Sequence, residues 1–215
     1  VLGRAAFREL ELKVDDRALI PRPETEVLVD EVLRWVEANL DGGGDLRALD
    51  VGTGSGAIAL SLALEGPFGG VVATDPSEEA LALARENRES AGLVDAVELR
   101  AGSLFEPVET GERFHVVVSN PPYIAREEAG GLAPEVAEWE PDAALYAGPD
   151  GLEILRPLIR EAHGVLHRGG LLALEMASTR AEAVSALVRE TGSYAEATVR
   201  KDLAGRDRIL LAVRR

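Results

Sequence analysis

The sequence predicts an α/β fold in which helices cover both faces of a mostly parallel sheet. Short apolar runs with strand character alternate with amphipathic helical patterns, which is the order of repeated β-α-β units. A glycine-rich segment, residues 50–56, follows the first buried run and opens a helical pattern. Two successive strand patterns, at residues 194–200 and 208–213, predict an antiparallel hairpin at the C-terminal edge of the sheet.

The bulk composition limits the classes of protein to which the chain can belong. Its 215 residues are 46% hydrophobic and suit one folded domain. The absence of cysteine excludes disulfides, thiolate metal sites and a cysteine nucleophile, and it fits the cytoplasmic location that we expect. No apolar run approaches the ~20 residues of a membrane span. The net charge of −15 disfavours bare nucleic acid as a partner.

The first 40 residues are expected to form a strand and a helix that lead into a main domain of residues 41–215. Apolar and charged residues alternate over residues 7–14, which is the period of a half-buried strand. Pro23 suits the first turn of a helix, and helical spacing continues from there until Gly42. The chain opens on Val1 rather than Met, so we expect a fragment of a longer protein.

The main domain is predicted as alternating strands and helices. Strands are expected at 48–51, 71–74, 97–99, 114–119 and 171–176, and helices at 57–64, 77–91, 152–166 and 180–190. Three successive valines in the fourth strand indicate burial on both faces of the sheet. Pro157 is expected to bend the third helix. The loop over residues 124–151 is long enough to suggest a function, and Trp139 within it is expected either to cover a site or to pack.

A glycine-rich loop and a later acidic residue indicate a cofactor that carries a nucleoside. Glycines at 52, 54 and 56 leave the backbone open to close approach by a ligand. Asp75 ends the next strand, where a carboxylate can accept hydrogen bonds from both hydroxyls of a ribose. Ser103 and Leu104 follow the third strand, beside the expected place of an adenine ring. The alternative interpretations are a tight turn with an acidic helix cap, and an ordinary turn at Ser103.

The most informative segment is Asn120-Pro121-Pro122-Tyr123, which follows the valine-rich strand. Consecutive prolines fix φ and supply no N–H, so a main-chain oxygen of Asn120 or Pro121 is free to point into a cavity. The Asn120 side chain offers a second acceptor, and Tyr123 offers a flat face for a planar group. Two convergent acceptors suit an NH₂ group. The other interpretation is a strand that ends in a double-proline turn.

Such a segment suits methyl transfer to a planar amide nitrogen. An amide nitrogen is a poor nucleophile because its lone pair is delocalised into the carbonyl group. Two acceptors on its hydrogens favour the charge that builds on nitrogen during attack, and they fix its angle toward a sulfonium methyl. The reaction is then an in-line displacement that depends mainly on positioning and on directed dipoles.

With both motifs in place, the chain resembles class I methyltransferases and, more narrowly, it is similar to the HemK-type peptide chain release factor glutamine methyltransferases. The resemblance runs from about Phe7 to the C-terminus and rests on DVGTGSGAIAL at 50–60, NPPY at 120–123, IPRPETE at 20–26, Glu140-Pro141, Ala144-Leu145 and Asp150-Gly151-Leu152. The NPPY segment alone is shared with DNA adenine and ribosomal RNA guanine methyltransferases, so IPRPETE is the more specific marker. The implied fold is a Rossmann-like sheet of seven strands.

The resemblance also implies a substrate, a cofactor and a set of residue roles. The substrate is the glutamine of a Gly-Gly-Gln loop in release factors, which act in translation termination, and the methyl donor is S-adenosyl-L-methionine. Amide-binding residues are expected in NPPY, and the expected cofactor contacts are Gly52, Thr53, Gly54, Ser55, Gly56, Asp75, Ser103, Leu104, Asn120, Arg22 and Thr25. The family normally carries a helical N-terminal domain that docks the release factor, and we expect that domain to be absent from this chain. A monomer is expected.

Two departures from the family pattern affect these expectations. The family often has Asp where Ser103 stands, so the adenine contact is expected to differ. After the last parallel strand Glu175 is retained, but Ala177 replaces the usual glycine. We therefore assign no substrate role to that loop.

Two other functions remain open. A DNA or ribosomal RNA amino-group methyltransferase shares the NPPY pocket but needs a cationic track for phosphates, which the net charge argues against. A nucleoside-sensing module would bind the cofactor without turnover, and the intact NPPY segment argues against it. His115, His163 and His167 share no metal-ligand spacing, so we expect structural roles for them and no metal site.

Overall fold

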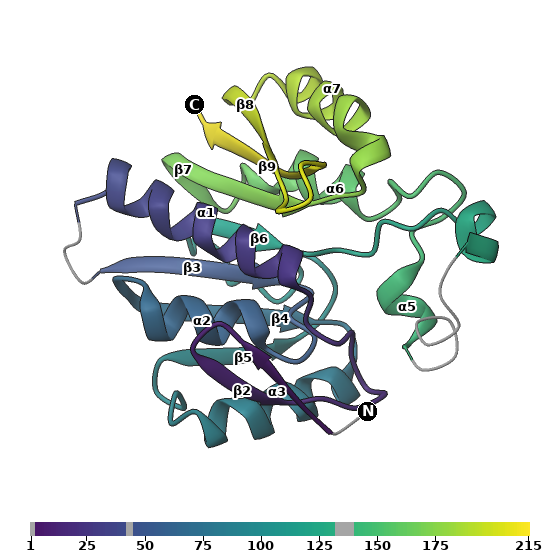
Figure 1. Cartoon of the computed structure of the whole chain (residues 1–215). Coiled ribbons are helices and arrows are strands. Elements are labelled where there is room, and N and C mark those ends of the chain that lie inside the picture. The colour runs from purple at the N-terminus through teal and green to yellow at the C-terminus, as the bar shows by residue number, and fades with distance from the viewer. Residues whose placement is uncertain (1–2, 42–44, 132–139) are drawn as a thin grey trace.

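A computed structural model of the chain describes residues 3–41, 45–131 and 140–215. Its centre is a sheet in the order β5-β4-β3-β6-β7-β9-β8 (Figure 1). The strands are β3 (Leu46–Val51), β4 (Phe68–Asp75), β5 (Val97–Ala101), β6 (Phe114–Ser119), β7 (Leu166–Glu175), β8 (Tyr194–Lys201) and β9 (Asp207–Arg214). Neighbours from β5 to β7 are parallel, whereas β9 is antiparallel to both β7 and β8. The predicted parallel sheet with an antiparallel edge hairpin is confirmed.

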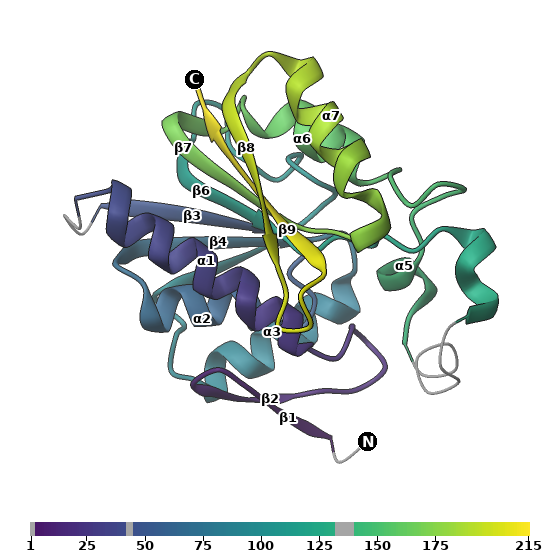
Figure 2. The ribbon, with the colours of Figure 1, turned by 45° about the horizontal axis from the view of Figure 1, so that its top comes forward.

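Helices cover both faces of this sheet (Figure 1, Figure 2). One face carries α1 (Pro23–Asn39) and α2 (Ala57–Glu65), and the other carries α6 (Leu155–Ala162) and α7 (Ala181–Thr191). The helix α3 (Glu78–Ser90) packs against β4 and β5. In β6, Val116 and Val118 join the core under α1 and α2, whereas Val117 joins the opposite core. The predicted burial of this strand on both faces is therefore confirmed.

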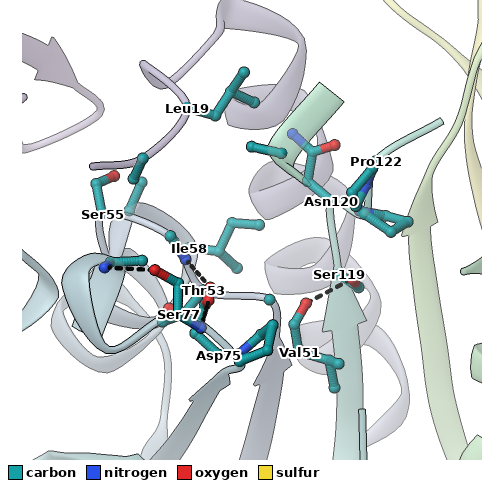
Figure 3. A pocket seen from close by; sticks show the side chains of 18 of the residues that line it. Leu19, Val51, Thr53, Ser55, Ile58, Asp75, Ser77, Ser119, Asn120 and Pro122 are labelled. Atoms are coloured by element: carbon teal, nitrogen blue, oxygen red, sulfur yellow. Dashed lines mark hydrogen bonds between the residues drawn. The ribbon is translucent and has the colours of Figure 1, made fainter. Parts of the chain in front are cut away.

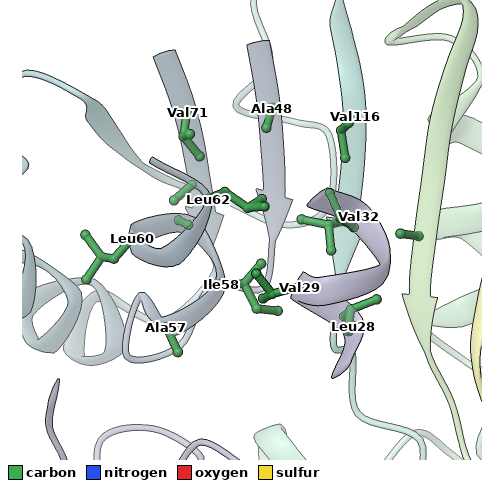
Figure 4. Close-up of a cluster of buried hydrophobic side chains, with 14 of the residues drawn as sticks. Leu28, Val29, Val32, Ala48, Ala57, Ile58, Leu60, Leu62, Val71 and Val116 are labelled. Carbon is green, nitrogen blue, oxygen red and sulfur yellow. The ribbon is translucent and has the colours of Figure 1, made fainter. Parts of the chain in front are cut away.

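A core of buried apolar side chains packs α1 and α2 against the sheet (Figure 4). Its members are fully or nearly fully buried apolar side chains from the two helices and from β3, β4 and β6, among them Leu28, Val29, Val32, Ala48, Ile58, Leu62, Val71 and Val116. Each buried methylene contributes about 0.8 kcal/mol. This packing holds the first turns of α1 and α2 beside the carboxyl ends of the parallel strands.

The N-terminal segment is a two-stranded hairpin, so the strand predicted over residues 7–14 is confirmed only for residues 10–13, and the turn and the strand before it were missed. The strands are β1 (Arg4–Phe7) and β2 (Leu10–Lys13). The chain turns at Arg8, whose φ is 51°, a conformation that non-glycine residues rarely adopt. Hydrogen bonds from the Arg8 guanidinium to Glu65 and Asp30 stabilise it there. The sequence contains no turn residue at this point, which explains why the alternation looked continuous.

The predicted helix over residues 152–166 is shorter in the structure, because α6 ends at Ala162 and β7 begins at Leu166. Pro157 is the third residue of α6, and a proline is tolerated in the first turn of a helix. The bend was expected because the predicted helix began at residue 152, which would have placed Pro157 further inside it; α6 begins at Leu155.

The long segment before α6 contains short regular elements: η1 (Arg126–Gly131), α5 (Asp142–Leu145) and a bridge between Ile124 and Tyr146. Trp139 lies outside the described residues. Within the described ranges, no helix has both the length and the apolar character required to span a bilayer.

One buried side chain joins the N-terminal hairpin to the sheet. The amide of Asn87, in α3, donates to the main-chain oxygens of Lys13 (3.1 Å) and Ser55 (2.9 Å). Its oxygen accepts the Lys13 N–H at 2.7 Å. Asn87 therefore connects β2, α3 and the glycine-rich loop after β3 through three hydrogen bonds.

We expect Asn87→Ala to lower the free energy of unfolding by about 1–3 kcal/mol, because one buried and two part-buried backbone groups lose their partner. Urea denaturation followed by circular dichroism measures the change. Asn39→Ala is the matched control, since among the described residues the exposed Asn39 amide donates only to the Trp35 oxygen, near the end of α1. Similar midpoint shifts for the two variants would contradict the prediction.

Candidate functional site

A cavity of about 240 Å³ lies at the carboxyl ends of the parallel strands. From the neighbouring strands β3 and β6 the sheet order runs in opposite directions, toward β4 and toward β7, and ligands of open α/β sheets bind in the crevice at such a point. The wall includes the loop after β3, the end of β4, the end of β6 and the segment before α1 (Figure 3). The turn after β5 and residues from α5 and α6 complete it. The topology thus brings together segments that are far apart in sequence.

The glycine-rich loop folds over the end of β4. The N–H groups of Gly52 and Thr53 both donate to the Thr74 oxygen, at 2.8 and 2.9 Å. Gly52 has a φ of 74°, and a Cβ there would meet no protein atom within 4 Å, so the loop leaves open space on the cavity side. Thr53, Gly54 and Ser55 also line the cavity.

Gly56 does not line the cavity, unlike the rest of its loop. A Cβ at this position would lie 3.2 Å from Leu60 Cδ1 and 3.4 Å from Ala84 Cβ. Its φ of 88° also disfavours any other residue. The third glycine therefore permits close packing at the start of α2, whereas Gly52 leaves room for a ligand.

Asp75 ends β4 and presents a fixed carboxylate to the cavity. One oxygen accepts the Gly54 N–H and the other accepts the Ser77 N–H, both at 2.9 Å. Burial raises the pKa of this carboxyl, and the two backbone hydrogen bonds act in the opposite direction. Each carboxylate oxygen has more than one acceptor position, so Asp75 retains capacity for two hydroxyl groups of a ligand (Figure 3).

A second carboxyl group, Asp50, is fully buried beneath the loop. One of its oxygens accepts from the Thr53 hydroxyl at 2.6 Å and from the Ala59 N–H at 3.2 Å. The other oxygen has no hydrogen-bond partner among the residues that the structure describes. Burial, reinforced by the charge of Asp75, raises the pKa of Asp50 to about 7. In the sequence, Asp50 is only the first residue of the glycine-rich motif, and its raised pKa could not be predicted from that position.

The turn after β5 places Ser103 and Leu104 in the cavity wall, as predicted. Leu104 has a φ of 49°, a left-handed conformation that is uncommon for leucine. Its side chain also packs against the core under α6 and α7. The wall at this point is therefore apolar and firmly anchored.

The Asn120-Pro121-Pro122 segment forms the opposite wall. The Ser119 hydroxyl donates to the Val51 oxygen at 2.6 Å and so fixes the end of β6 to the end of β3. In the described part of the chain, neither the Asn120 nor the Pro121 carbonyl accepts a hydrogen bond outside the regular sheet ladder. Figure 3 shows Asn120 and Pro122 across the cavity from Asp75.

Tyr123 does not line the cavity, although the sequence placed its ring against a bound group. Its hydroxyl donates to Glu175 Oε1 at 3.1 Å, and its ring packs against the core under α6 and α7. Burial raises the pKa of the Tyr123 hydroxyl. The tyrosine therefore lies behind the wall formed by Asn120 and the prolines.

Thr25 and Arg22, predicted near the pocket from the IPRPETE segment, have different positions. Thr25 is buried in the first turn of α1 and lines the cavity. Its hydroxyl donates to Glu175 Oε2 at 2.8 Å and accepts the Asn120 side-chain N–H at 3.0 Å. Arg22 is not part of the lining, and its guanidinium pairs with the buried Glu140 at 2.5 Å. Arg22 thus ties the segment before α1 to the loop before α5.

One wall of the cavity was missed from the sequence. Arg17, Ala18 and Leu19, between β2 and the IPRPETE segment, all line it. They show no strand or helix period that would assign them to a site, and only their place beside the IPRPETE segment connected them with function. Glu175 was also left without a role, although it contacts both Thr25 and Tyr123.

The three histidines lie outside the cavity wall. His115 Nδ1 accepts the Arg47 N–H at 3.1 Å. The rings of His115 and His167 have centroids 4.4 Å apart. These contacts support the structural roles expected for His115 and His167, and the role of His163 stays a prediction.

Comparisons with known proteins agree with this geometry. A family model described as a methyltransferase domain matches residues 43–208. A Clostridium acetobutylicum protein named release factor glutamine methyltransferase is 41% identical over 215 residues, which are 100% of this chain and 74% of that protein. Proteins with the same name from Moorella thermoacetica and Deinococcus radiodurans are each 45% identical, over 99% of this chain and 73% and 72% of their own lengths.

Solved structures confirm the predicted fold. A methyltransferase from Pyrococcus furiosus aligns with a TM-score of 0.67 at 24% identity, over 97% of this chain and 90% of that one. The 16S rRNA N2 G1207 methyltransferase of Thermus thermophilus, in complex with AdoMet and guanosine, aligns with a TM-score of 0.66 at 19% identity, over 99% of this chain and 50% of that one. At such low identity these likenesses show the fold alone.

The buried carboxyl of Asp50 makes stability depend on pH. Its pKa rises from the ordinary 3.8 to about 7 on folding, so between these values the folded chain holds a proton that the unfolded chain has lost. The contribution of Asp50 to stability is full below about pH 4 and is lost as pH rises through 7. We expect the melting temperature of Asp50→Asn, relative to the unsubstituted protein, to rise between pH 5 and pH 8 in thermal denaturation.

The control for this comparison is Asp95→Asn, which removes the same charge from an exposed position. It reports the long-range effect of one negative charge on a chain of net charge −15. If the two variants differ from the unsubstituted protein by the same amount at every pH, the assignment of the titration to Asp50 is wrong.

Proposed function

This chain belongs to the release factor glutamine methyltransferase family, and from that premise we propose that it methylates the side-chain amide nitrogen of the glutamine in the Gly-Gly-Gln motif of a peptide chain release factor. The methyl donor in this proposal is S-adenosyl-L-methionine. The identity of 41–45% to proteins of that name supports the substrate, and the cavity supports the chemistry.

The observation that carries the proposal is the orientation of the Asn120 amide. Its Nδ2 donates to Thr25 at 3.0 Å, and no group of the described residues donates to its Oδ1. Asn120 lines the cavity together with Pro121 and Pro122. The segment therefore offers amide and carbonyl oxygens whose acceptor capacity is not used by the protein, and a substrate NH₂ supplies two matching donors.

The residues at the other end of the cavity fit a nucleoside-bearing sulfonium donor. The open space beside Gly52 admits a ligand against the backbone, and Asp75 presents two oxygens suited to ribose hydroxyls. Leu104 and Ile58 offer apolar surface. When bound, S-adenosylmethionine supplies an electrophilic methyl carbon. We propose Gly52, Thr53, Gly54, Ser55, Asp75, Ser103 and Leu104 as the residues that hold it.

The protein contributes mainly positioning. The ionisable residues among the lining groups are Arg17 and Asp75, and neither belongs to the Asn-Pro-Pro wall. No strong base is required there, because the amide nitrogen becomes acidic once it is alkylated. Asn120 and the neighbouring main-chain oxygen align the substrate nitrogen and favour the positive charge that develops on it. The prolines supply no N–H that would compete for these oxygens.

We further propose a monomeric cytoplasmic enzyme whose partner is the release factor. The alternative, a DNA or ribosomal RNA amino-group methyltransferase, is not favoured, because the similar proteins share the release factor name. The net charge of −15 also opposes binding to a phosphate backbone. Filter binding with duplex DNA and structured RNA tests the alternative, which tight, salt-sensitive binding would favour.

Mass spectrometry of a release factor incubated with this protein and labelled S-adenosylmethionine tests the proposed function. We expect one labelled methyl group on the glutamine of the Gly-Gly-Gln motif. Asn120→Ala is expected to lower kcat by about 100-fold or more, as for the removal of a positioned polar group. Asn39→Ala, at the exposed end of α1, is the control and should retain normal turnover.

Failure of the unsubstituted protein to label the release factor under conditions where it binds S-adenosylmethionine would refute the substrate. A near-normal kcat for Asn120→Ala would instead refute the role of Asn120 while leaving the substrate unchallenged. The two results therefore separate the reaction from the residue.

Asp75→Ala is expected to weaken S-adenosylmethionine binding by about 1–3 kcal/mol, because hydrogen bonds to a charged acceptor are lost. Isothermal titration calorimetry measures the change in Kd. The exposed Asp95→Ala is the control for loss of one negative charge. Equal affinities for the Asp75 variant and the unsubstituted protein would show that the carboxylate does not contact the cofactor.

A further inference from the structure

We propose that Thr25 and Glu175 are positioning residues that fix the orientation of the Asn120 amide, so that its oxygen and not its NH₂ faces the substrate. The inference rests on the proposed function, since it concerns how the same cavity holds the substrate amide. Neither residue needs to touch the reacting atoms. Glu175 belongs to β7 and Thr25 to the first turn of α1, so the arrangement joins elements 150 residues apart.

The three side chains form a continuous line of hydrogen bonds. The Asn120 Nδ2 donates to the Thr25 hydroxyl oxygen at 3.0 Å, and the Thr25 hydroxyl donates to Glu175 Oε2 at 2.8 Å. Thr25 is 4% exposed and Glu175 is 1% exposed. Bulk water therefore does not compete for the bonds that Glu175 and Thr25 make.

The chemistry of the hydroxyl group gives this line one direction. A threonine hydroxyl has a single proton, whereas an ionised carboxylate only accepts. Because the proton of Thr25 is donated to Glu175, the Thr25 oxygen can only accept from Asn120. The amide of Asn120 must then turn its NH₂ toward Thr25, which leaves its oxygen for the substrate.

Glu175 is itself held as an acceptor on both sides. Its second oxygen accepts the Tyr123 hydroxyl at 3.1 Å. Burial raises the pKa of Glu175, whereas the two hydroxyl donors and the charge of Arg208 lower it, and Glu24 adds a like charge. The buried carboxylate thus accepts a hydrogen bond at each oxygen. The bond from Tyr123 explains why this tyrosine lies behind the cavity wall.

The opposite orientation of the Asn120 amide would place its NH₂ against the NH₂ of a glutamine side chain. Two donors cannot satisfy each other, and the developing positive charge on the substrate nitrogen would meet hydrogens instead of an oxygen. A wrong orientation would thus leave S-adenosylmethionine binding intact but impair transfer. This separates a positioning role from a general loss of the site.

The chain allows a direct readout of the Asn120 amide in the absence of any substrate. It contains three asparagines, Asn39, Asn87 and Asn120, and no glutamine. A ¹H–¹⁵N NMR spectrum of the uniformly labelled protein therefore has three side-chain NH₂ pairs. We expect Thr25→Val to shift the Asn120 pair while the Asn39 and Asn87 pairs stay in place, and Thr25→Ser, which retains a hydroxyl, to restore its position.

Kinetics with the release factor then measure the consequence. Thr25→Val is expected to lower kcat on the order of 10- to 100-fold, with the Kd for S-adenosylmethionine within about 2-fold of normal. Thr25→Ser is the matched control and should recover most of the rate. If Thr25→Val leaves both kcat and the Asn120 NH₂ pair unchanged, or if Thr25→Ser loses activity to the same extent, the proposal is overturned.

Glu175→Gln tests the direction of the hydrogen bonds without changing size. The Tyr123 hydroxyl donates to one end of this side chain, so it selects the carbonyl oxygen of the new amide and leaves the new NH₂ facing Thr25. The Thr25 hydroxyl then donates its proton to Asn120 instead of Glu175. We expect the Asn120 side-chain amide to flip, so that its oxygen faces Thr25 and its NH₂ faces the substrate. We expect a loss of kcat similar to that of Thr25→Val, with a shifted Asn120 pair, and full activity would overturn the proposal.

These measurements remain informative if the proposed function itself fails. Absence of methyl transfer by the unsubstituted protein would refute the function, whereas the NMR signals would still report on the Thr25–Asn120 contact. A folded spectrum and a normal melting temperature for each variant exclude unfolding as the cause of lost activity.

Discussion

The neighbouring positions of β3 and β6 are the constraint from which the site follows. Sheet order runs away from this pair in opposite directions, so the loops that leave the two strands diverge and a cavity forms between them. The hydrogen bond from Ser119 to the Val51 oxygen, at 2.6 Å, fixes the two strand ends to each other. The pairing of β3 with β6 therefore fixes the distance between the glycine-rich loop and the Asn-Pro-Pro wall.

Polar groups buried around this cavity are mostly satisfied in pairs that cross from one element to another. Asp75 joins β4 to the glycine-rich loop, and Thr25 joins α1 to the ends of β6 and β7. An unpaired buried polar group costs about 1–3 kcal/mol, so each contact restricts the relative position of the elements that it connects. Asp50 and Glu140 are exceptions, because one oxygen of each carboxyl lacks a partner in the described part of the chain. The same contacts that stabilise the fold therefore also set the geometry of the wall.

The sequence predicted the sheet and most of the cavity, because these depend on local patterns. The Val116–Val118 run, the G-x-G-x-G spacing and the double proline after Asn120 each have one dominant physical explanation. The turn at Arg8 was missed because side-chain contacts with Glu65 and Asp30, and no turn residue, hold it. The link between Thr25 and Glu175 joins residues 150 positions apart. A contact at that separation leaves no period or spacing in the sequence, so coordinates are needed to see it.

The single amide of Asn87 has a consequence for how small this protein can be made. It satisfies the backbone at Lys13 on one side and at Ser55 on the other. A version trimmed to begin after β2 would remove two of the three hydrogen-bond partners of that amide, beside the loop that forms part of the cavity wall. The hairpin resembles a dispensable extension when it is seen along the chain, but it acts as a structural support for the loop. The shortest version that keeps all three Asn87 hydrogen bonds therefore includes Lys13.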